Sequence, residues 1–374
     1  MRVAMFYHSL VSDWNHGNAH FLRGIASELI ARGCDVRVFE PYDGWSLSNL
    51  RREHGEQPLA DFRRAYPALS SRMFSLESLN LNRELDGVDL VLVHEWNDRE
   101  LVRRIGEQRA QSNSFRLLFH DTHHRSVTDA ASMSGYDLEH YDGVLAFGEA
   151  IRHIYLRNSW TQYAWTWHEA ADTRIFKPHP KIETFGDVVW IGNWGDDERA
   201  AELNEFLIQP LQQSILKGRV YGVRYPESAL ETLRCSNIGY GGWLSNFHVP
   251  AVFAQFRATV HVPRRPYATA LPGIPTIRPF EALACGIPLV SAPWTDSEHL
   301  FRAGKDYLTA RNGAEMKTHL RAIVNDPAMA AELSASGRET ILARHTCAHR
   351  VDELMDIYQR IAPARMETAA TGIA

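Results

Sequence analysis

The sequence predicts an α/β protein with two domains in series, each built around a parallel β-sheet. Short apolar segments alternate with amphipathic segments along most of the chain, which is the pattern of successive βαβ units. The chain has 374 residues, more than one hydrophobic core usually organises. The alternation stops near residue 165 and starts again near residue 187. We therefore expect one domain on each side of this break.

The first half contains five apolar segments that we expect to be strands. They cover residues 2–8, 35–41, 86–96, 115–121 and 141–148. After the first of them, Leu22, Ile25 and Leu29 recur at helical spacing and Gly33 ends the pattern, which predicts a helix. Residues 50–80 show no clear period, so helix, loop or both stay open there.

The second half repeats this organisation. The expected strands cover residues 187–195, 218–226, 237–244, 257–263 and 287–293. A helix is expected over 198–215, and the chain ends in an amphipathic helix followed by a tail of small residues that we expect to be disordered.

Composition argues against several partners. The formal net charge is −5, whereas a nucleic-acid binder needs Lys and Arg in excess, so we expect no nucleic-acid partner. No apolar run approaches the roughly 20 residues of a membrane span, and the start lacks the features of a signal peptide. We expect a cytoplasmic protein without a transmembrane segment, for which peripheral membrane contact stays open. The four cysteines lack metal-site spacing and predict reduced thiols.

The predicted strands end in polar and aromatic residues, and strand ends are where ligands bind in doubly wound sheets. His94 and Glu95 end one strand, and Asn193 follows another. Gly17 and Asn18 precede the first helix, whose free N–H groups suit an anion or a carbonyl, although a turn with an Asn cap explains them equally. The GxGxxG dinucleotide pattern is absent. We expect the site in a cleft between the two domains.

Residues 119–124 read FHDTHH and place three histidines beside one aspartate. Such side chains suit zinc or iron, but no HExxH spacing or second cluster accompanies them, so we expect no metal. Proton exchange between His120 or His123 and a ligand hydroxyl is more plausible. Structural roles in a hydrogen-bonded loop remain the alternative.

Residues 272–294 read PGIPTIRPFEALACGIPLVSAPW, with Glu281 in an otherwise apolar helix. Burying a carboxylate is costly unless a partner pairs with it. Arg264 and Arg265 come shortly before this segment, and guanidinium groups beside a helix N-terminus suit a diphosphate. Adjacent residues of an extended chain face opposite ways, so we expect only one arginine to act in this way. Solvated surface charge is the alternative.

Several of these segments resemble a known family. Residues 166–178, TWHEAADTRIFKP, are similar to the interdomain connector of retaining GT-B glycosyltransferases, and residues 280–294 to the donor-binding helix of that superfamily. VHVPRRPY at 260–267 and RHTCAHRVDEL at 344–354 are similar to its CgeB-like (spore-maturation-protein-like) subgroup. The resemblance spans nearly the whole chain.

The resemblance implies the GT-B fold, in which two Rossmann-like domains face each other across a cleft. It implies an acceptor-side domain over 1–165, a donor-side domain over 166–345, a helix over 346–363 that packs toward the first domain, and a disordered tail over 364–374. The implied activity is metal-independent transfer, with retention, from a nucleoside-diphosphate sugar to an acceptor. That acceptor is a saccharide, a lipid-linked sugar, a protein or a small molecule, and no cofactor is implied.

The resemblance also implies site residues. Those matched to donor binding are Glu281 at the ribose, Thr276 and Ile277 at the diphosphate, and Trp243 and Leu244 at the nucleobase. His94 and His120 end first-domain strands that face the cleft. With Glu95 they are the candidates for catalysis, His120 first, although a retaining front-face mechanism needs no protein nucleophile.

The chain departs from the family pattern in two places. Gly273 stands where the superfamily has a glutamate near the donor sugar, and only Arg199 remains of the basic pair expected after the first strand of the second domain. We therefore hypothesise that Arg264 or Arg265, helped by Arg278, neutralises the diphosphate.

Three other functions stay open. A nucleotide-sugar epimerase or hydrolase on the same fold needs no acceptor. A non-catalytic nucleotide-sugar-binding protein is consistent with the missing glutamate. A metal-dependent hydrolase built on residues 120–124 is the third.

Overall fold

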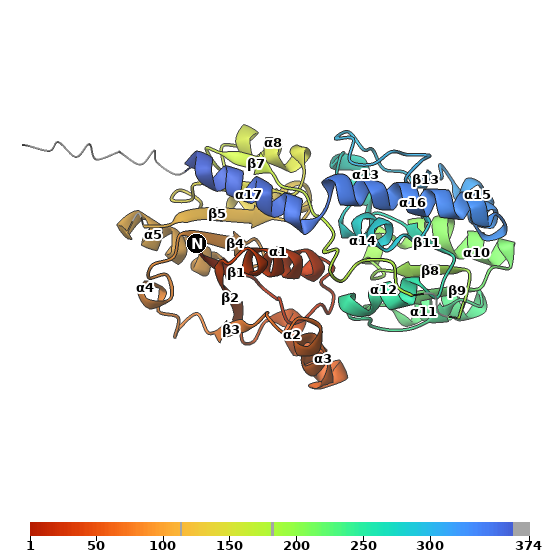
Figure 1. Cartoon of the computed structure of the whole chain (residues 1–374), viewed down its shortest axis with the longest axis horizontal. Coiled ribbons are helices and arrows are strands. Elements are labelled where there is room, and N and C mark those ends of the chain that lie inside the picture. Colours follow the sequence, from red (N-terminus) through yellow and green to blue (C-terminus); the bar gives the residue numbers. More distant parts are fainter. Residues whose placement is uncertain (113, 181–182, 362–374) are drawn as a thin grey trace, which may run out of the picture.

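The computed structural model describes residues 1–112, 114–180 and 183–361, and its two β-sheets lie side by side (Figure 1). The first sheet has seven strands in the order β3-β2-β1-β4-β5-β6-β7, and every neighbouring pair is parallel. Its strands are β1 (Arg2–Phe6), β2 (Asp35–Pro41), β3 (Ser71–Phe74), β4 (Leu90–His94), β5 (Arg116–Asp121), β6 (Gly143–Ala146) and β7 (Ala164–Thr166).

Helices connect these strands, as parallel pairing requires. They are α1 (Ala19–Ala31), α2 (Trp45–His54), α3 (Gln57–Ala65), α4 (Leu81–Glu84), α5 (Arg99–Ser112), α6 (Arg125–Thr128), α7 (Ala130–Ser134) and α8 (Glu149–Arg157). The central strands β1 and β4 are apolar and buried because helices cover both faces of the sheet.

The second sheet has six parallel strands in the order β10-β9-β8-β11-β12-β13. They are β8 (Val188–Ile191), β9 (Gly218–Tyr221), β10 (Gly239–Tyr240), β11 (Ala258–His261), β12 (Leu289–Ser291) and β13 (Leu308–Thr309). All strands of one sheet end at the same edge, so each domain presents one row of strand ends.

The helical elements of the second half include short 3₁₀ turns and one π-turn. They are η1 (Asp196–Glu198), α9 (Ala200–Leu203), the π-turn η2 (Asn204–Ile208), α10 (Gln209–Ser214), α11 (Glu227–Cys235), η3 (Asn246–His248), α12 (Val249–Phe253), α13 (Arg265–Ala270), α14 (Ile277–Cys285), α15 (Gly313–Asn325), α16 (Pro327–Arg344) and α17 (Cys347–Ile361). Pro327 opens α16 after an Asp326 cap, and Gly286 at φ 69° ends α14 in the left-handed conformation.

The two domains share apolar packing. One core cluster includes Phe21 of α1, Trp167 and Phe176 of the connector, and Phe280 of α14. The domains therefore meet over a buried apolar contact as well as across a cleft.

The last helix returns to the first domain. After α16, the chain crosses beside the interdomain connector, where backbone N–H of Ala171 donates to His345 at 2.9 Å and that of Cys347 donates to Ala171 at 3.0 Å. Helix α17 then packs along α1 (Figure 1). Arg32 at the end of α1 lies 2.5 Å from Asp352 of α17.

The predicted fold class is confirmed, with differences in detail. Most strands are shorter than their apolar segments, because the flanking polar residues belong to loops. Residues 50–80 contain the end of α2 together with α3 and β3. The short strands β7 and β13 were not predicted. The helix expected over 198–215 is interrupted by the π-turn η2. The tail predicted over 364–374 lies outside the described residues.

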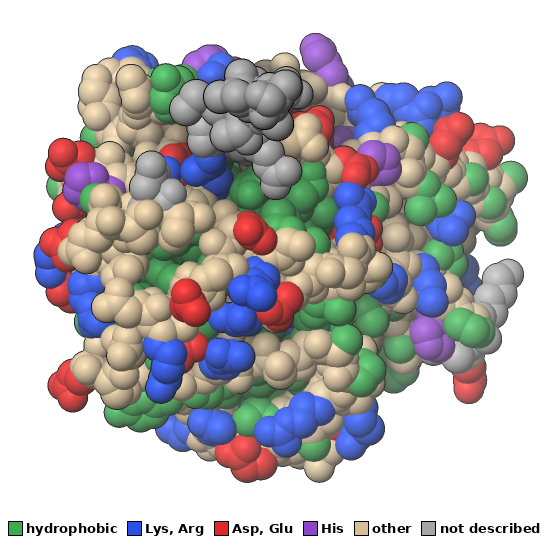
Figure 2. All heavy atoms as spheres, turned by 60° about the vertical axis from the view of Figure 1, so that its left-hand side comes forward, with side chains coloured by type: hydrophobic (Ala, Val, Ile, Leu, Met, Phe, Trp, Pro, Cys, Tyr) green, Lys and Arg blue, Asp and Glu red, His purple; other side chains and the backbone are tan. Residues whose placement is uncertain are grey.

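Charged side chains of both signs are interspersed on the face shown in Figure 2. Among the described helices, none is both long and apolar enough to cross a lipid bilayer.

Candidate active site

The two domains enclose a cleft of about 600 Å³ at the carboxyl ends of their strands. First-domain residues come from the ends of β1, β2, β4, β5 and β6 and the segments after them. Second-domain residues come from the ends of β8, β9 and β11, the segments after them, and the start of α14. The predicted site residues that line it are Gly17, Asn18, His123, Asn193, Arg264, Thr276, Ile277 and Arg278.

Trp243 and Leu244 line a smaller pocket that adjoins the cleft. Asn193 and Arg278 line both spaces. The Nε1 of Trp243 donates to Oδ1 of Asp13 at 3.1 Å, so this second-domain loop is tied to the first domain.

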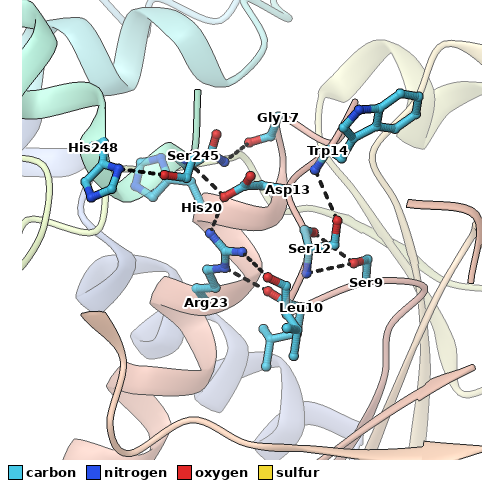
Figure 3. Close-up of polar contacts among 12 residues, drawn as sticks. Ser9, Leu10, Ser12, Asp13, Trp14, Gly17, His20, Arg23, Ser245 and His248 are labelled. Atoms are coloured by element: carbon cyan, nitrogen blue, oxygen red, sulfur yellow. Dashed lines mark hydrogen bonds and ion pairs between the residues drawn. The ribbon is translucent and has the colours of Figure 1, made fainter. Parts of the chain in front are cut away.

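A buried ion pair between Arg23 and Asp13 organises the loop between β1 and α1 (Figure 3). Arg23 Nη1 lies 2.8 Å from Asp13 Oδ2, and its other nitrogens donate to the carbonyl oxygens of Leu10 at 2.7 Å and Val11 at 2.8 Å. The same Asp13 oxygen accepts from the backbone N–H of Asn246 at 3.0 Å. The loop that carries Gly17 and Asn18 is therefore fixed to both domains.

Arg199 brings a partly buried cation to the cleft. Its guanidinium donates to the carbonyl oxygens of Val262 at 3.2 Å and of Asn193, and it lies 5.1 Å from the centre of the Trp190 ring. No carboxylate of the described residues forms an ion pair with it, and Nε has no partner among them. Burial, with Arg264 nearby, lowers the pKa of Arg199 to about 9. Partly buried charge of this kind favours binding of an anion.

Arg264 and Arg265 diverge as expected, although the cause differs from the one predicted: Arg264 is the N-cap of α13 and Arg265 is its first helical residue. Arg264 lines the cleft, where it lies 2.8 Å from Oε2 of Glu198. Arg265 is exposed and lies 2.9 Å from Glu202, away from the cleft. Of the two predicted diphosphate ligands, the structure brings only Arg264 to the site.

The N-terminus of α14 opens onto the cleft. Thr276 precedes the helix at φ 62° and ψ −177°, a conformation that is almost confined to glycine and costs on the order of 1–3 kcal/mol. Ile277 and Arg278 supply the first two helical N–H groups, whereas Pro279 has none. Because the first turn offers few amide donors, neighbouring side chains must provide most of the positive charge.

Glu281 has partners within the chain. It is 0% exposed, and Nδ1 of His20 lies 3.0 Å from its Oε1, while Arg278 donates to Oε2. The backbone N–H of Asp172 donates to His20 Nε2 at 2.8 Å, so Nδ1 carries the proton that His20 donates to Glu281. The carboxylate is therefore already paired within the chain, whereas the resemblance implied only the ribose of a bound nucleotide as its partner. Glu281 does not line the cleft, and its role at a ribose stays a prediction.

Glu169 is a cleft residue that sequence reasoning missed. It is 5% exposed, lines the cleft, and its Oε2 has no hydrogen-bond partner among the described residues. Burial, together with the charge of Glu281, raises the pKa of Glu169 to about 8. The sequence feature that could have pointed to Glu169 is its position in the interdomain connector, where the family pattern has an asparagine. Arg199 was likewise noted only as a remnant of a basic pair.

The three candidates for catalysis lie behind the cleft wall. His120 packs against Phe21 and Trp167 and does not line the cleft, and both ring nitrogens lack partners among the described residues. His94 Nδ1 lies 3.0 Å from Glu95 Oε2, and both side chains are fully buried. The structure does not bring these three side chains to the substrate space, since all three are buried and none lines the cleft.

The space in which a side chain at position 273 would lie is filled by the carboxylate of Glu298. A side chain in place of Gly273 would meet the Glu298 carboxylate, and the φ of 89° disfavours any residue other than glycine. Oε2 of Glu298 lies 2.9 Å from His168 Nε2, and Oε1 accepts from the backbone N–H of Glu149 at 2.9 Å. Glu298 thus fills the space beside Gly273 and links the second domain to the start of α8.

Within the described residues, no group of three or more His, Cys, Asp or Glu side chains has an arrangement that could hold a metal ion. His120 lies apart from His123 and His124, whose ring centroids are 4.0 Å from each other. His120 lies in the core, and His124 Nδ1 contacts Thr128 at 2.9 Å.

Residues 199–356 match a protein family described as Glycosyl transferase-like. No curated protein is detectably similar to the chain in sequence.

Solved structures of low sequence identity share the fold over nearly the whole chain. Sucrose-phosphate synthase from Thermosynechococcus elongatus is 15% identical, with a TM-score of 0.64 over 96% of this chain and 99% of that chain. HepE from Anabaena, in complex with UDP and glucose, is 14% identical, with a TM-score of 0.68 over 96% and 99%. BGT of phage T4, with its UDP-glucose substrate, is 12% identical, with a TM-score of 0.58 over 97% and 100%.

These likenesses show the GT-B arrangement of two parallel sheets with helices. The family match covers most of the second domain, and the fold is the one predicted.

Proposed function

From its glycosyltransferase-like second domain and the charge of its cleft, we propose that the chain transfers a sugar from a nucleoside-diphosphate sugar to an acceptor, with retention and without a metal ion. Assignment to the CgeB-like subgroup is part of this proposal. UDP is the first nucleotide to test, since HepE and BGT were solved with UDP or UDP-glucose.

The observation that carries the proposal is the uncompensated cation of Arg199. A partly buried guanidinium whose Nε is shielded from water and which lacks a carboxylate partner is unfavourable, and a diphosphate would supply the missing charge and accept hydrogen bonds from its nitrogens. Arg264 and Arg278 line the same space, and the first amides of α14 add donors.

This arrangement acts on the leaving group. The bond between the sugar's anomeric carbon and the diphosphate oxygen breaks with its electrons on the diphosphate, where the guanidinium groups stabilise the new charge. The acceptor oxygen bonds to the same carbon on the same face, which retains configuration. Its proton passes to the departing phosphate oxygen, so no protein nucleophile is required.

The test compares two arginines on opposite sides of one wall. Arg199→Ala is expected to raise the Kd of UDP, measured by calorimetry, by about tenfold or more. Arg265→Ala is the matched control, since its side chain points away from the cleft and pairs with Glu202. If both variants bind UDP with wild-type affinity, the assignment of the diphosphate site fails.

Turnover separates the remaining alternatives. An epimerase or hydrolase converts the nucleotide sugar at full rate without an acceptor, and a binding protein shows affinity without turnover. The anomeric configuration of the product, read by NMR, tests retention. Unchanged activity after exhaustive treatment with a chelator is expected for a metal-independent transferase.

A further inference from the structure

The two walls of the cleft differ in charge. The second-domain wall contains Arg199, Arg224, Arg264 and Arg278. The first-domain wall consists of the lining residues between His8 and Phe147, and none of those described is Lys, Arg, Asp or Glu. A ligand that spans the cleft therefore meets cations on one side only.

The imidazoles of the first-domain wall are neutral. Burial lowers the pKa of His8 to about 3, with Arg125 adding to the effect. Burial also holds the pKa values of His16 and His123 well below their usual range. This wall offers no counter-charge to a phosphate or a carboxylate near neutral pH.

The same wall has polar atoms without partners. Nε2 of His16, Nδ1 of His123 and both polar side-chain atoms of Asn18 are buried and make no hydrogen bond within the described chain. Leaving such groups unsatisfied costs roughly 1–3 kcal/mol each. They are uncharged groups that can donate or accept, which suits the hydroxyl groups of a sugar.

Two tryptophans complete this wall. Trp45 is 57% exposed and Trp96 is 44% exposed, although both line the cleft. The Arg125 guanidinium lies 4.0 Å from the centre of the Trp96 ring and donates to the carbonyl oxygen of Glu95 at 2.9 Å, which holds the indole in place. Exposed, fixed aromatic rings favour a partner with an apolar face, such as the C–H face of a pyranose.

We infer that the first-domain wall binds an uncharged saccharide as the acceptor, packed on Trp45 and Trp96 and hydrogen-bonded to His16, Asn18 and His123. This inference rests on the proposed transferase function and narrows its acceptor. A phosphorylated or acidic acceptor would place its charge against a wall whose lining residues include no cation, since Arg125 stacks on Trp96 without lining the cleft.

The first experiment compares acceptors that differ only in charge. With UDP-glucose as donor, glucose, methyl glucoside, maltose and lactose are tested against glucose 6-phosphate and glucuronic acid. Transfer to a neutral sugar is expected with kcat/KM about tenfold or more above that of its charged counterpart. An octyl glucoside arm, below its micelle concentration, distinguishes a free saccharide from a lipid-linked one. Preference for the charged sugars overturns the inference.

The second experiment removes the aromatic rings. Trp45→Ala and Trp96→Ala are each expected to lower kcat/KM for the acceptor by about tenfold while leaving the Kd of UDP unchanged. Tyr163→Ala is the control, since Tyr163 is an exposed aromatic residue that does not line the cleft. Losses no larger than that of the control overturn the inference.

The two proposals fail differently. Absence of binding of UDP, GDP, ADP and TDP to the wild-type chain, measured before any acceptor is added, contradicts the proposed function. Binding and transfer to charged acceptors alone leave that function standing and contradict the saccharide acceptor.

Discussion

His20 Nδ1 lies 3.0 Å from Glu281 Oε1, and this contact joins α1 of the first domain to α14 of the second. Both side chains are fully buried. Because His20 also accepts from the backbone N–H of Asp172 in the connector, one imidazole orders three segments that meet behind the cleft.

Replacement of His20 should weaken the whole chain. His20→Ala leaves the buried Glu281 with Arg278 as its remaining partner, and we expect the free energy of unfolding in urea to fall by about 3 kcal/mol. His153→Ala is the control, because His153 is exposed on α8. An equal, small loss in both variants would show that the buried contact contributes nothing.

Glu281 can influence the nucleotide directly or through Arg278. Glu281→Ala is expected to raise the Kd of UDP about tenfold, near 1.4 kcal/mol. If the carboxylate acts by positioning Arg278, the double variant with Arg278→Ala binds no more weakly than Arg278→Ala alone. Additive losses would instead support a separate ribose contact. Calorimetry on the wild type, the two single variants and the double variant distinguishes the indirect role from the direct ribose contact. An unchanged Kd in Glu281→Ala contradicts both roles.

Glu169 should make stability depend on pH. Its pKa is raised to about 8 in the folded chain, so the folded state holds the proton more tightly than the unfolded state. The resulting stability is present below the ordinary glutamate pKa and is lost as pH rises through about 8. At 1.36 kcal/mol per pKa unit, we expect the wild type to lose about 2 kcal/mol more than Glu169→Gln between about pH 6 and pH 8.

Urea unfolding at both pH values measures this difference. Other groups titrate in the same pH range, so the contribution of Glu169 is read from the difference between the wild type and Glu169→Gln. Parallel pH profiles would mean that Glu169 is ionised in the folded chain.

Local patterns predicted the fold and part of the cleft. The alternation of apolar segments located the central strands. The expectation that only one of Arg264 and Arg265 reaches the cleft also agrees with the structure, although Arg265 begins α13 and does not continue an extended chain. The start of α14 was found because proline, glycine and an acidic residue interrupt an apolar run.

Contacts between distant segments could not be predicted in this way. The partner of Glu281 is 261 residues away, and nothing local marks His20 as that partner. His120 is the penultimate residue of β5 rather than its last, and its ring packs against Phe21 of α1 instead of lining the cleft. Only the packed structure shows that Glu169 is buried and that its Oε2 has no hydrogen-bond partner among the described residues.

The return of α17 to α1 has a consequence for synthesis on the ribosome. Val351, Leu354 and Ile357 of α17 are buried, and α17 packs against α1. This side of α1 stays uncovered while the entire second domain is being translated. The first domain is thus begun first and completed last, and a chain released before residue 347 would expose an apolar stripe on the domain that emerged earliest.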